Sequence, residues 1–473
     1  MEKTNHLKEG EKSKAVQQLP YLLFGLPLIL AYISWHWFPF LVDYVVGYFF
    51  RCTPKLQTAH WLWRATVYFL YTWYTFLAIG VGGTFVVAAW LWKRKKIPEK
   101  KMDYPMVSFV TPAYNEEKQI LRCIASLFKC ATQYPGPCEI IVIDDGSEDH
   151  TYEVALATVE TNRGRYPHVY GKVVRHSANL GKAEAIRTGV NKAMGSVVAV
   201  VDADSWWEPG ALTELINYMN SNGKVAATGY IHPSNGGKES NPYVILQQLE
   251  YSQGLGIFRC AQALGNAVLV IPGPIGVYRA DILRKILNKK KMHTVTEDLE
   301  ITLEMQKEKL SVGYVVRARG STLAPTSFRD FWAQRIRWFI GWLHNILEVH
   351  RELLYSRQWI ASLLWYYLFL GYIGAVVEII ATFSVPFLFW FSPDRTCFLI
   401  NLLIFVPYAL LVGIINQAIA LKFSYDQFNY RRLLLYTPLY GVLRLINVCA
   451  RFACLVKFFI GERGSWRETR RRH

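Results

Sequence analysis

Two aspartates that follow a short apolar run offer the clearest candidate chemistry in this chain. The run Val197–Val201 is apolar and β-branched, which predicts a strand covered on both faces, and Asp202-Ala203-Asp204 follows it directly. In open α/β sheets, ligands bind beyond the carboxyl ends of the strands. Two carboxylates at such an end suit Mg2+ or Mn2+ held jointly with a substrate diphosphate. A polar turn that binds nothing is the alternative for so short a motif.

Polar and aromatic residues also follow two earlier predicted strands. Val107–Val110 leads into Tyr114 and Glu116, and Glu139–Ile143 leads into Asp145. At such strand ends an aromatic ring can stack on a nucleobase, and carboxylates can accept hydrogen bonds from uracil or from ribose hydroxyls. Taken separately, each group is also ordinary turn chemistry.

Three further sites in the sequence offer a cation, a glycine that lets the backbone come close to a sugar, and a candidate base. Lys182 opens a predicted helix, where a cation can meet a phosphate, and Gly273 lies in a small-residue segment that can approach a sugar closely. Thr296-Glu297-Asp298 opens another predicted helix, with Thr296 as its expected N-cap and a carboxylate as candidate general base. The alternatives are a solvated lysine and two acids that only complement the helix dipole.

The most specific single motif is Gln334-Arg335-Ile336-Arg337-Trp338. Arginine pairs clamp diphosphate oxygens, and tryptophan stacks on sugar rings. This motif opens an amphipathic stretch beside later apolar runs, so an Arg/Trp anchor at a membrane surface is the alternative interpretation.

Composition places these residues in a soluble domain between membrane segments. The chain has 473 residues, of which 52% are hydrophobic and 15% aromatic, and long charge-poor runs occupy both ends. Between them, Met102–Leu323 alternates short apolar runs, among them a fourth predicted strand at Val169–Val174, with helical patterns, which predicts a mostly parallel α/β sheet. The formal charge of +17 arises largely from basic clusters beside apolar runs, which favours contact with anionic membrane lipid and argues against nucleic acid as a partner.

Charges beside the apolar runs predict the topology. The second run ends in Trp92-Lys93-Arg94-Lys95-Lys96, so this end and the domain that follows are expected in the cytoplasm. Arg444 and Arg451 lie seven residues apart in the last apolar run. Because arginines within a bilayer are costly, we expect an interfacial or re-entrant helix there and a cytoplasmic C-terminus, with a fifth crossing as the alternative.

The order of these motifs resembles that of a known family. Asp-Asp-Gly, Asp-x-Asp, Thr-Glu-Asp and Gln-x-x-Arg-Trp, in that order and between membrane blocks, are similar to the processive, inverting family-2 glycosyltransferases that make hyaluronan, chitin, cellulose or poly-N-acetylglucosamine. The resemblance implies a mostly parallel α/β GT-A-type domain inserted between α-helical transmembrane blocks of a multi-pass plasma-membrane protein. The implied segments are a cytoplasmic tail (1–18), two transmembrane helices (19–92), the cytoplasmic catalytic domain (93–327), interfacial amphipathic helices (328–358), a transmembrane hairpin (359–421), an interfacial or re-entrant helix (422–460) and a basic tail (461–473).

The resemblance also implies a role for each matching residue. Asp298 would be the catalytic base, and Asp202 and Asp204 would hold the diphosphate through Mg2+ or Mn2+. Trp338 would stack on the growing polysaccharide acceptor at the entrance of a channel, and Trp466 lies in a segment similar to a gating segment of hyaluronan and chitin synthases. The remaining positions expected to bind the UDP-sugar donor or the sugar are Tyr114, Glu116, Asp145, Lys182, Gly273, Glu297, Gln334, Arg335 and Arg337.

UDP-N-acetylglucosamine is the favoured donor, because the segment Gly273–Arg279 leans toward hyaluronan and chitin synthases. A cellulose-like synthase that uses UDP-glucose is one alternative, and a non-processive transferase that acts on a lipid-linked acceptor is another. A transporter or receptor whose middle domain only binds nucleotide would be favoured by inverted repeats, and the sequence contains none that is visible.

Overall fold

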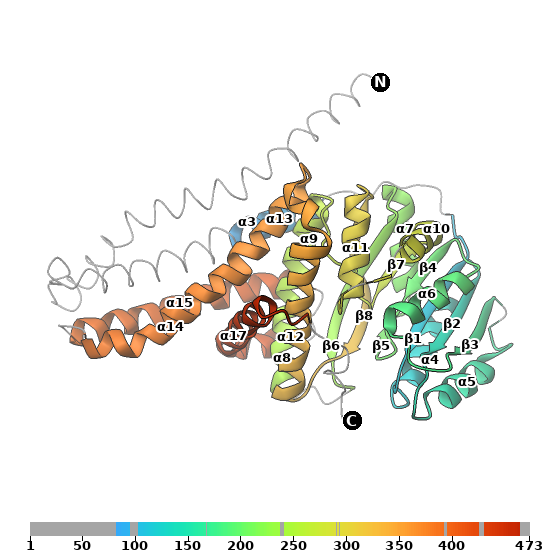
Figure 1. The fold of residues 1–473 in the computed structure, drawn as a ribbon, viewed down its shortest axis with the longest axis horizontal. Coiled ribbons are helices and arrows are strands. Elements are labelled where there is room, and N and C mark those ends of the chain that lie inside the picture. Colours follow the sequence, from blue (N-terminus) through green and yellow to red (C-terminus); the bar gives the residue numbers. More distant parts are fainter. Residues whose placement is uncertain are drawn as a thin grey trace, which may run out of the picture.

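An eight-stranded mixed sheet lies to one side of the molecule in the computed structural model (Figure 1). The structure describes residues 82–94, 103–166, 168–236, 241–289, 291–292, 294–391, 395–424 and 430–463. The strand order is β3-β2-β1-β4-β7-β6-β8-β5. The strands are β1 (Val107–Ala113), β2 (Cys138–Asp144), β3 (Val169–Arg175), β4 (Val197–Val200), β5 (Ser205–Trp207), β6 (Ala226–Ser234), β7 (Gly276–Arg279) and β8 (Val312–Leu323).

The sheet that was predicted to be mostly parallel is mixed, with four parallel and three antiparallel strand pairings. Strands β3, β2, β1 and β4 run parallel, and these are the four strands that the sequence predicted. Strand β7 pairs antiparallel with both β4 and β6, and β5 pairs antiparallel with β8, whereas β6 and β8 pair parallel. Hydrophobic patterning reports which residues are buried but not the direction in which a strand enters the sheet, so the sequence did not reveal that β7 and β5 run antiparallel to their neighbours.

The buried strands β1, β2 and β4 fix the position at which Asp202 leaves the sheet. Every residue of β1 and of β2 is buried, as expected for strands covered on both faces. Strand β4 ends at Val200, one residue earlier than predicted, but the Val201 N–H still donates to the Val110 carbonyl oxygen at 3.0 Å. Asp202 therefore begins where the parallel pairing ends.

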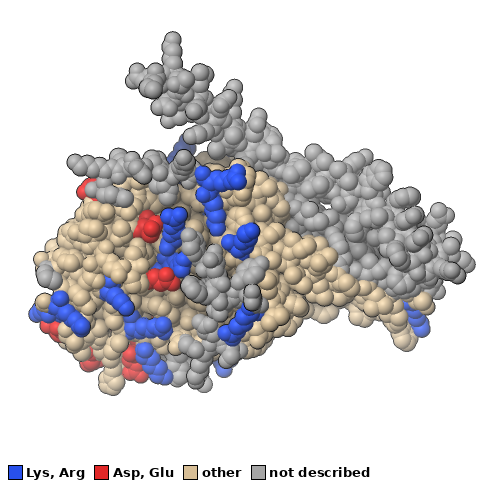
Figure 2. All heavy atoms as spheres, turned by 180° about the vertical axis from the view of Figure 1, so that it is seen from behind, with Lys and Arg blue, Asp and Glu red and all other residues tan. Residues whose placement is uncertain are grey.

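Helices pack on the sheet and support its edges. Helix α6 packs on β1 and on α10, α7 packs on β8 and β6, and α4 packs on α5. On the face shown in Figure 2, Lys and Arg side chains lie in separate groups with Asp and Glu side chains between them. The helices of this part are α4 (Ile120–Thr132), α5 (Thr151–Asn162), α6 (Lys182–Lys192), α7 (Ala211–Asn222), α10 (Ala280–Lys289) and α11 (Glu297–Lys307).

A second group of helices lies beside the sheet, and two of them, α14 and α15, project away from it (Figure 1). Helix α12 packs against α17, α14 packs against α17, and α8 packs against α15. The members are α3 (Gly82–Arg94), α8 (Pro242–Gln253), α9 (Arg259–Leu264), α12 (Phe328–His344), α13 (Trp359–Tyr366), α14 (Gly374–Phe391), α15 (Arg395–Phe423), α16 (Tyr430–Leu435) and α17 (Tyr440–Phe459). Between them lie π-helical turns at Gly254–Phe258, Asn345–Val349 and Tyr367–Ile373, and 3-10 turns at Arg351–Tyr355 and Thr437–Leu439.

Within the described residues, two helical stretches are long and apolar enough to cross a membrane. They are Trp359–Phe387 and Thr437–Phe459, and this criterion of length and composition is weak evidence by itself. The first falls inside the predicted hairpin, and the second falls where an interfacial or re-entrant helix was expected. The predicted first two membrane helices, apart from the end that forms α3, and the N-terminal tail lie outside the described residues, as does Trp466. The topology stays a prediction.

Candidate active site

One cavity of about 830 Å3 joins the carboxyl edge of the sheet to the second group of helices. At one end it is lined by Asp202, Asp204 and Asp298, and at the other by residues of α14, α15 and α17. Ten of the residues predicted from the sequence line it together: Lys182, Asp202, Asp204, Gly273, Glu297, Asp298, Gln334, Arg335, Arg337 and Trp338.

Lys182 lies between two carboxylates at the sheet end of the cavity. Its Nζ is 2.8 Å from Oδ1 of Asp202 and 2.7 Å from Oε1 of Glu297. Burial lowers the pKa of Lys182, but the neighbouring carboxylates outweigh that effect, so the net shift is upward and the lysine stays charged. The half-buried cation therefore ties the end of β4 to the start of α11.

The loop before Lys182 is held by Asp145, at the end of β2. Oδ1 of Asp145 accepts from the Leu180 N–H at 3.1 Å, and Oδ2 accepts from the Gly181 N–H at 2.8 Å. The ring of His176 lies 2.7 Å from Oδ1. Gly181 has a φ of 96°, a conformation that favours glycine, and it leads directly into α6. Asp145 thus positions Lys182 through the backbone, and its expected contact with UDP stays a prediction.

Gly273 fits closely against the carboxylate of Asp202. A Cβ at this position would lie 2.5 Å from both Oδ1 and Oδ2 of Asp202, and the Gly273 carbonyl oxygen accepts from the Asp202 N–H at 3.2 Å. Burial raises the pKa of Asp202, Lys182 opposes the shift, and Asp204 adds to it. A side chain at position 273 would displace the carboxylate.

Asp202 and Asp204 fit a divalent cation that is shared with a diphosphate. Oδ1 of Asp204 lies 3.1 Å from the Ser205 hydroxyl and 3.3 Å from the Thr322 hydroxyl, which fix its orientation. No cluster of three or more His, Cys, Asp or Glu side chains suited to a metal occurs among the described residues. Mg2+ commonly takes one or two carboxylates and completes its octahedron with water and substrate phosphate, so this donor set suits it.

Asp298 has the properties of a base that works near neutral pH. Its Oδ1 accepts from the Leu299 N–H at 2.8 Å. Burial is the main cause that raises the pKa of Asp298 to about 6, Glu297 adds to it, and Lys182 opposes it. Thr296 occupies the N-cap position, but its side chain does not cap the helix as predicted. Its hydroxyl instead accepts from the Asn345 side chain at 3.1 Å.

Tyr114 and Glu116 lie in a loop at the end of β1 and are not part of the cavity lining. This loop interlocks with the loop that follows β2. The Asn115 N–H donates to the Ser147 hydroxyl at 3.0 Å, and the Glu116 N–H donates to the Thr151 hydroxyl at 2.7 Å. Strands β1 and β2 are neighbours in the sheet, which brings these loops together. Nucleobase binding by Tyr114 and Glu116 stays a prediction.

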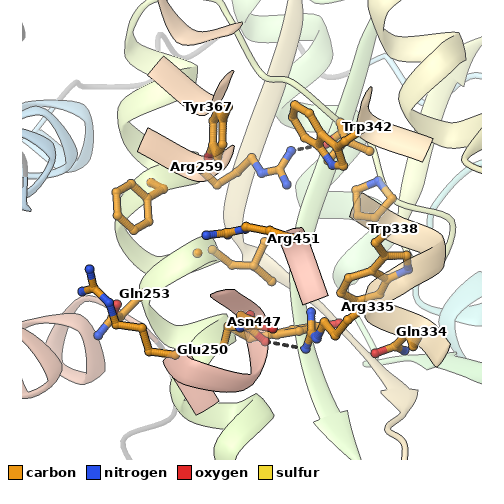
Figure 3. A pocket seen from close by; sticks show the side chains of 18 of the residues that line it. Glu250, Gln253, Arg259, Gln334, Arg335, Trp338, Trp342, Tyr367, Asn447 and Arg451 are labelled. Atoms are coloured by element: carbon orange, nitrogen blue, oxygen red, sulfur yellow. Dashed lines mark hydrogen bonds and ion pairs between the residues drawn. The ribbon is translucent and has the colours of Figure 1, made fainter. Parts of the chain in front are cut away.

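The motif 334–338 lies on α12, which begins after Ser327, whose hydroxyl accepts from the Asp330 N–H at 3.2 Å. Figure 3 shows Gln334, Arg335 and Trp338 at the cavity. Arg335 is only 2% exposed, and its Nη2 lies 2.5 Å from Oε2 of Glu250. The structure pairs this guanidinium with a carboxylate of its own chain, whereas the sequence suggested a diphosphate clamp.

Sequence reasoning missed several charged and aromatic residues that line the same cavity. Glu250 lies on α8, Arg259 begins α9, and Glu378 lies on α14, each outside any motif. The carboxylate of Glu378 accepts from Nε of Arg444 at 3.1 Å. Figure 3 labels Arg259, Trp342, Tyr367 and Arg451 around the middle of the cavity. The one available signal was the pair of arginines in the last apolar run, since buried cations require partners.

Comparison with solved structures identifies the fold. A mannosyltransferase from Pyrobaculum calidifontis, solved in complex with GDP-Man and Mn2+, superposes with a TM-score of 0.57 at 14% identity, covering 85% of this chain and all of that one. At this identity the likeness shows the fold alone. It confirms the predicted GT-A-type fold, in which the sheet is mixed.

Curated relatives include synthases that are named for polysaccharides. A hyaluronan synthase from Streptococcus pyogenes is 27% identical over 276 residues, which is 56% of this chain and 61% of the synthase. A poly-beta-1,6-N-acetyl-D-glucosamine synthase from Staphylococcus epidermidis is 27% identical over 282 residues, which is 57% of this chain and 65% of that synthase. The alignments thus span about three fifths of the relatives' length. Residues 108–287 match the family described as Glycosyl transferase family 2, so the chain carries a glycosyltransferase family 2 domain.

Proposed function

We propose that this protein is a processive, inverting glycosyltransferase of the plasma membrane. It polymerises a UDP-sugar, with UDP-N-acetylglucosamine favoured, into a β-linked polysaccharide and extrudes the product through its own membrane channel. The observation that carries the proposal is the single cavity that runs from Asp202, Asp204 and Asp298 to α14, α15 and α17. A product formed at the sheet end could enter the second group of helices without leaving the protein.

The donor occupies the sheet end of this cavity. Asp202 and Asp204 hold Mg2+ or Mn2+, which when bound offsets the negative charge of the diphosphate. Lys182 on α6 and Arg337 on α12 supply further positive charge, since both line the cavity. Preorganised charges of this kind stabilise the charge that develops on a leaving group.

Asp298 acts as the general base. The acceptor hydroxyl attacks the anomeric carbon and transfers its proton to the Asp298 carboxylate, while the bond from that carbon to the diphosphate oxygen breaks and UDP leaves with the electron pair. Attack opposite the leaving group inverts an α-linked donor to a β-linked product. The raised pKa of Asp298 brings its proton affinity closer to that of a useful base at neutral pH.

Trp338 holds the acceptor end of the chain. It follows Arg337 on α12 and lines the cavity on the way to Trp342 and Tyr367, whose rings are 5.2 Å apart. Aromatic faces stack on sugar rings, so a wall with several such rings suits a saccharide. This path gives the product a course toward the predicted transmembrane helices.

A direct test supplies purified protein in lipid nanodiscs with Mg2+ or Mn2+ and one UDP-sugar at a time. UDP release and the length of the saccharide are measured, and the product is digested with linkage-specific hydrolases. The expected result is a long β-linked polymer from UDP-N-acetylglucosamine. Transfer of a single sugar to a lipid would support the non-processive alternative, and a polymer from UDP-glucose would support the cellulose-like one. Absence of UDP release would contradict the proposed glycosyltransferase activity.

A further inference from the structure

One carboxylate outside every recognised motif joins three helices at the cavity wall. Glu250 lies on α8, and its two oxygens have different partners. Oε2 lies 2.5 Å from Nη2 of Arg335 on α12, and Oε1 accepts from the Asn447 side chain on α17 at 3.0 Å. Figure 3 shows these three residues together below Arg451. Glu250 therefore joins α8 to two other helices of the second group, α12 and α17.

The guanidinium that Glu250 holds is also packed between two aromatic rings. Its central carbon lies 4.5 Å from the ring centre of Trp338 and 4.5 Å from that of Phe331. A cation over an indole face is attracted by the ring electrons, and the attraction grows when both are withdrawn from water. Arg335 is almost fully buried, so the position of its guanidinium depends on the Glu250 carboxylate. The contact that this guanidinium makes with the Trp338 ring therefore depends on Glu250 as well.

We propose that Glu250 is a positioning residue for the acceptor saccharide: it fixes Arg335 against Trp338 and, through Asn447, ties the orientation of that ring to α17. The inference rests on the proposed function, in which Trp338 stacks on the acceptor. Glu250 does not touch the reacting atoms in this scheme. Its effect is on the acceptor and not on the donor, which in the proposed function binds at the sheet end of the cavity with Lys182 and Asp202.

The charge of Glu250, and not its size, carries this role. In Glu250→Gln the side chain keeps its shape and can still bind Asn447, but Arg335 is left as a buried cation without its counter-charge. Loss of one partner of such a pair is expensive, and the guanidinium is then free to turn away from Trp338 toward water in the cavity. The indole loses the contact that holds its plane.

The experiment measures the KM for an added acceptor oligosaccharide, the KM for the UDP-sugar, kcat and the melting temperature on the full-length protein in nanodiscs. For Glu250→Gln we expect a rise of about tenfold in the acceptor KM with the donor KM within about twofold of wild type, because a misplaced stacking ring weakens one substrate only. Glu250→Asp, which keeps the charge, should recover part of the loss. Products made by Glu250→Gln should be shorter.

Two further variants separate positioning from general damage. Glu308→Gln removes a carboxylate from the exposed pair with Lys285, whose Nζ lies 3.1 Å from Oε2 of Glu308, and should leave both KM values unchanged. In a background that already carries Arg335→Gln, adding Glu250→Gln should change the acceptor KM little, since the two residues act through one contact. Asn447→Leu, which removes only the second anchor, should raise the acceptor KM less than Glu250→Gln does.

An unchanged acceptor KM in Glu250→Gln would overturn the inference, and so would additive effects of Glu250→Gln and Arg335→Gln. A fall in melting temperature with equal changes in both KM values would show a purely structural role and would also overturn it. If the wild-type protein transfers sugar to no saccharide acceptor, the proposed function fails and the inference fails with it. If wild type is active and Glu250→Gln matches it, only the inference fails.

Discussion

A single carboxylate, Asp298, carries the proton transfer in the proposed reaction, and its environment makes the rate depend on pH. Burial and Glu297 raise the pKa of Asp298 to about 6, and the base must be ionised to accept a proton. We therefore expect kcat/KM to fall about tenfold per pH unit below about pH 6 and to level off above it. The measurement is UDP release at limiting acceptor across pH 4.5–8, roughly the range over which such groups titrate.

Asp298→Asn is the matched control for this profile. It should bind the UDP-sugar nearly as wild type does, while turnover falls by about 10² to 10⁴-fold and the acidic limb disappears, since the group that titrates is gone. Donor affinity is measured by calorimetry. Retained turnover in this variant, or an unchanged limb, would remove Asp298 from the role of base.

The closeness of Gly273 to Asp202 predicts that even a methyl group is harmful there. Gly273→Ala places Cβ 2.5 Å from both carboxylate oxygens, so Asp202 must shift away from Lys182. We expect turnover to fall by about 10²-fold and donor affinity in Mn2+ to weaken, because small misplacements of positioning groups cost that much. Gly371→Ala, where a Cβ would meet nothing within 4 Å, is the control. Equal activity of the two variants would contradict the prediction.

For single residues, the sequence predicted which residues belong to the site better than it predicted which atoms their side chains contact. Lys182, Asp202 and Asp298 come together in one cavity as their motifs suggested. Asp145 and Arg335 have partners within the chain that the sequence did not indicate, and their expected contacts with substrate stay predictions. A motif indicates which type of side chain stands at a position. The atoms that this side chain contacts depend on the residues that pack around it in the folded protein.

At the scale of elements, an ion pair links α14 to α17 where the sequence suggested isolated arginines. The guanidinium of Arg444 meets the carboxylate of Glu378 through two contacts, at 3.1 and 2.5 Å. The side chain of Glu378 is 20% exposed and that of Arg444 is 41% exposed. Pairing removes much of the cost of an arginine in this helix, so the energetic argument against a membrane crossing weakens.

Breaking this pair should loosen the packing of α14 on α17. We expect Glu378→Gln to lower the free energy of unfolding by about 1–3 kcal/mol, less than for a fully buried pair because Arg444 is partly exposed. Thermal unfolding of the nanodisc-embedded protein measures the loss. The exchange Glu378→Arg with Arg444→Glu should recover part of it. Glu378→Gln as stable as wild type would indicate that the pair contributes nothing.

At the scale of the whole molecule, the cavity predicts a link between its width and product length. Gly371 lines the cavity in the π-helical turn Tyr367–Ile373, and a Cβ there would meet nothing within 4 Å. Gly371→Trp should therefore fold normally but narrow the path, giving shorter products with little change in the rate of the first transfer. Gel filtration of the saccharide measures length, with Gly371→Ala as the control. Full-length product from Gly371→Trp would argue against this path.

The parallel half of the sheet and the motifs at its edge were predictable because buried strands are apolar runs, and a run that ends in polar residues marks a strand end. Strands β5, β6, β7 and β8 were not predicted individually. Short strands such as β5 and β7, of three and four residues, leave little periodic signal, and their direction depends on the strands beside which they settle.

The sequence by itself determined the chemistry at the sheet edge. It specified two aspartates after a buried strand, a candidate base, an arginine and tryptophan motif, and apolar runs at both ends, because these are properties of residue type and short-range order. Only the tertiary structure decided that ten of these residues share one cavity, that β7 makes the sheet mixed, and that Glu250 and Glu378 neutralise Arg335 and Arg444. Such pairings join residues 66 to 85 positions apart, and they are fixed by packing and by the cost of a buried unpaired charge, which no local pattern encodes.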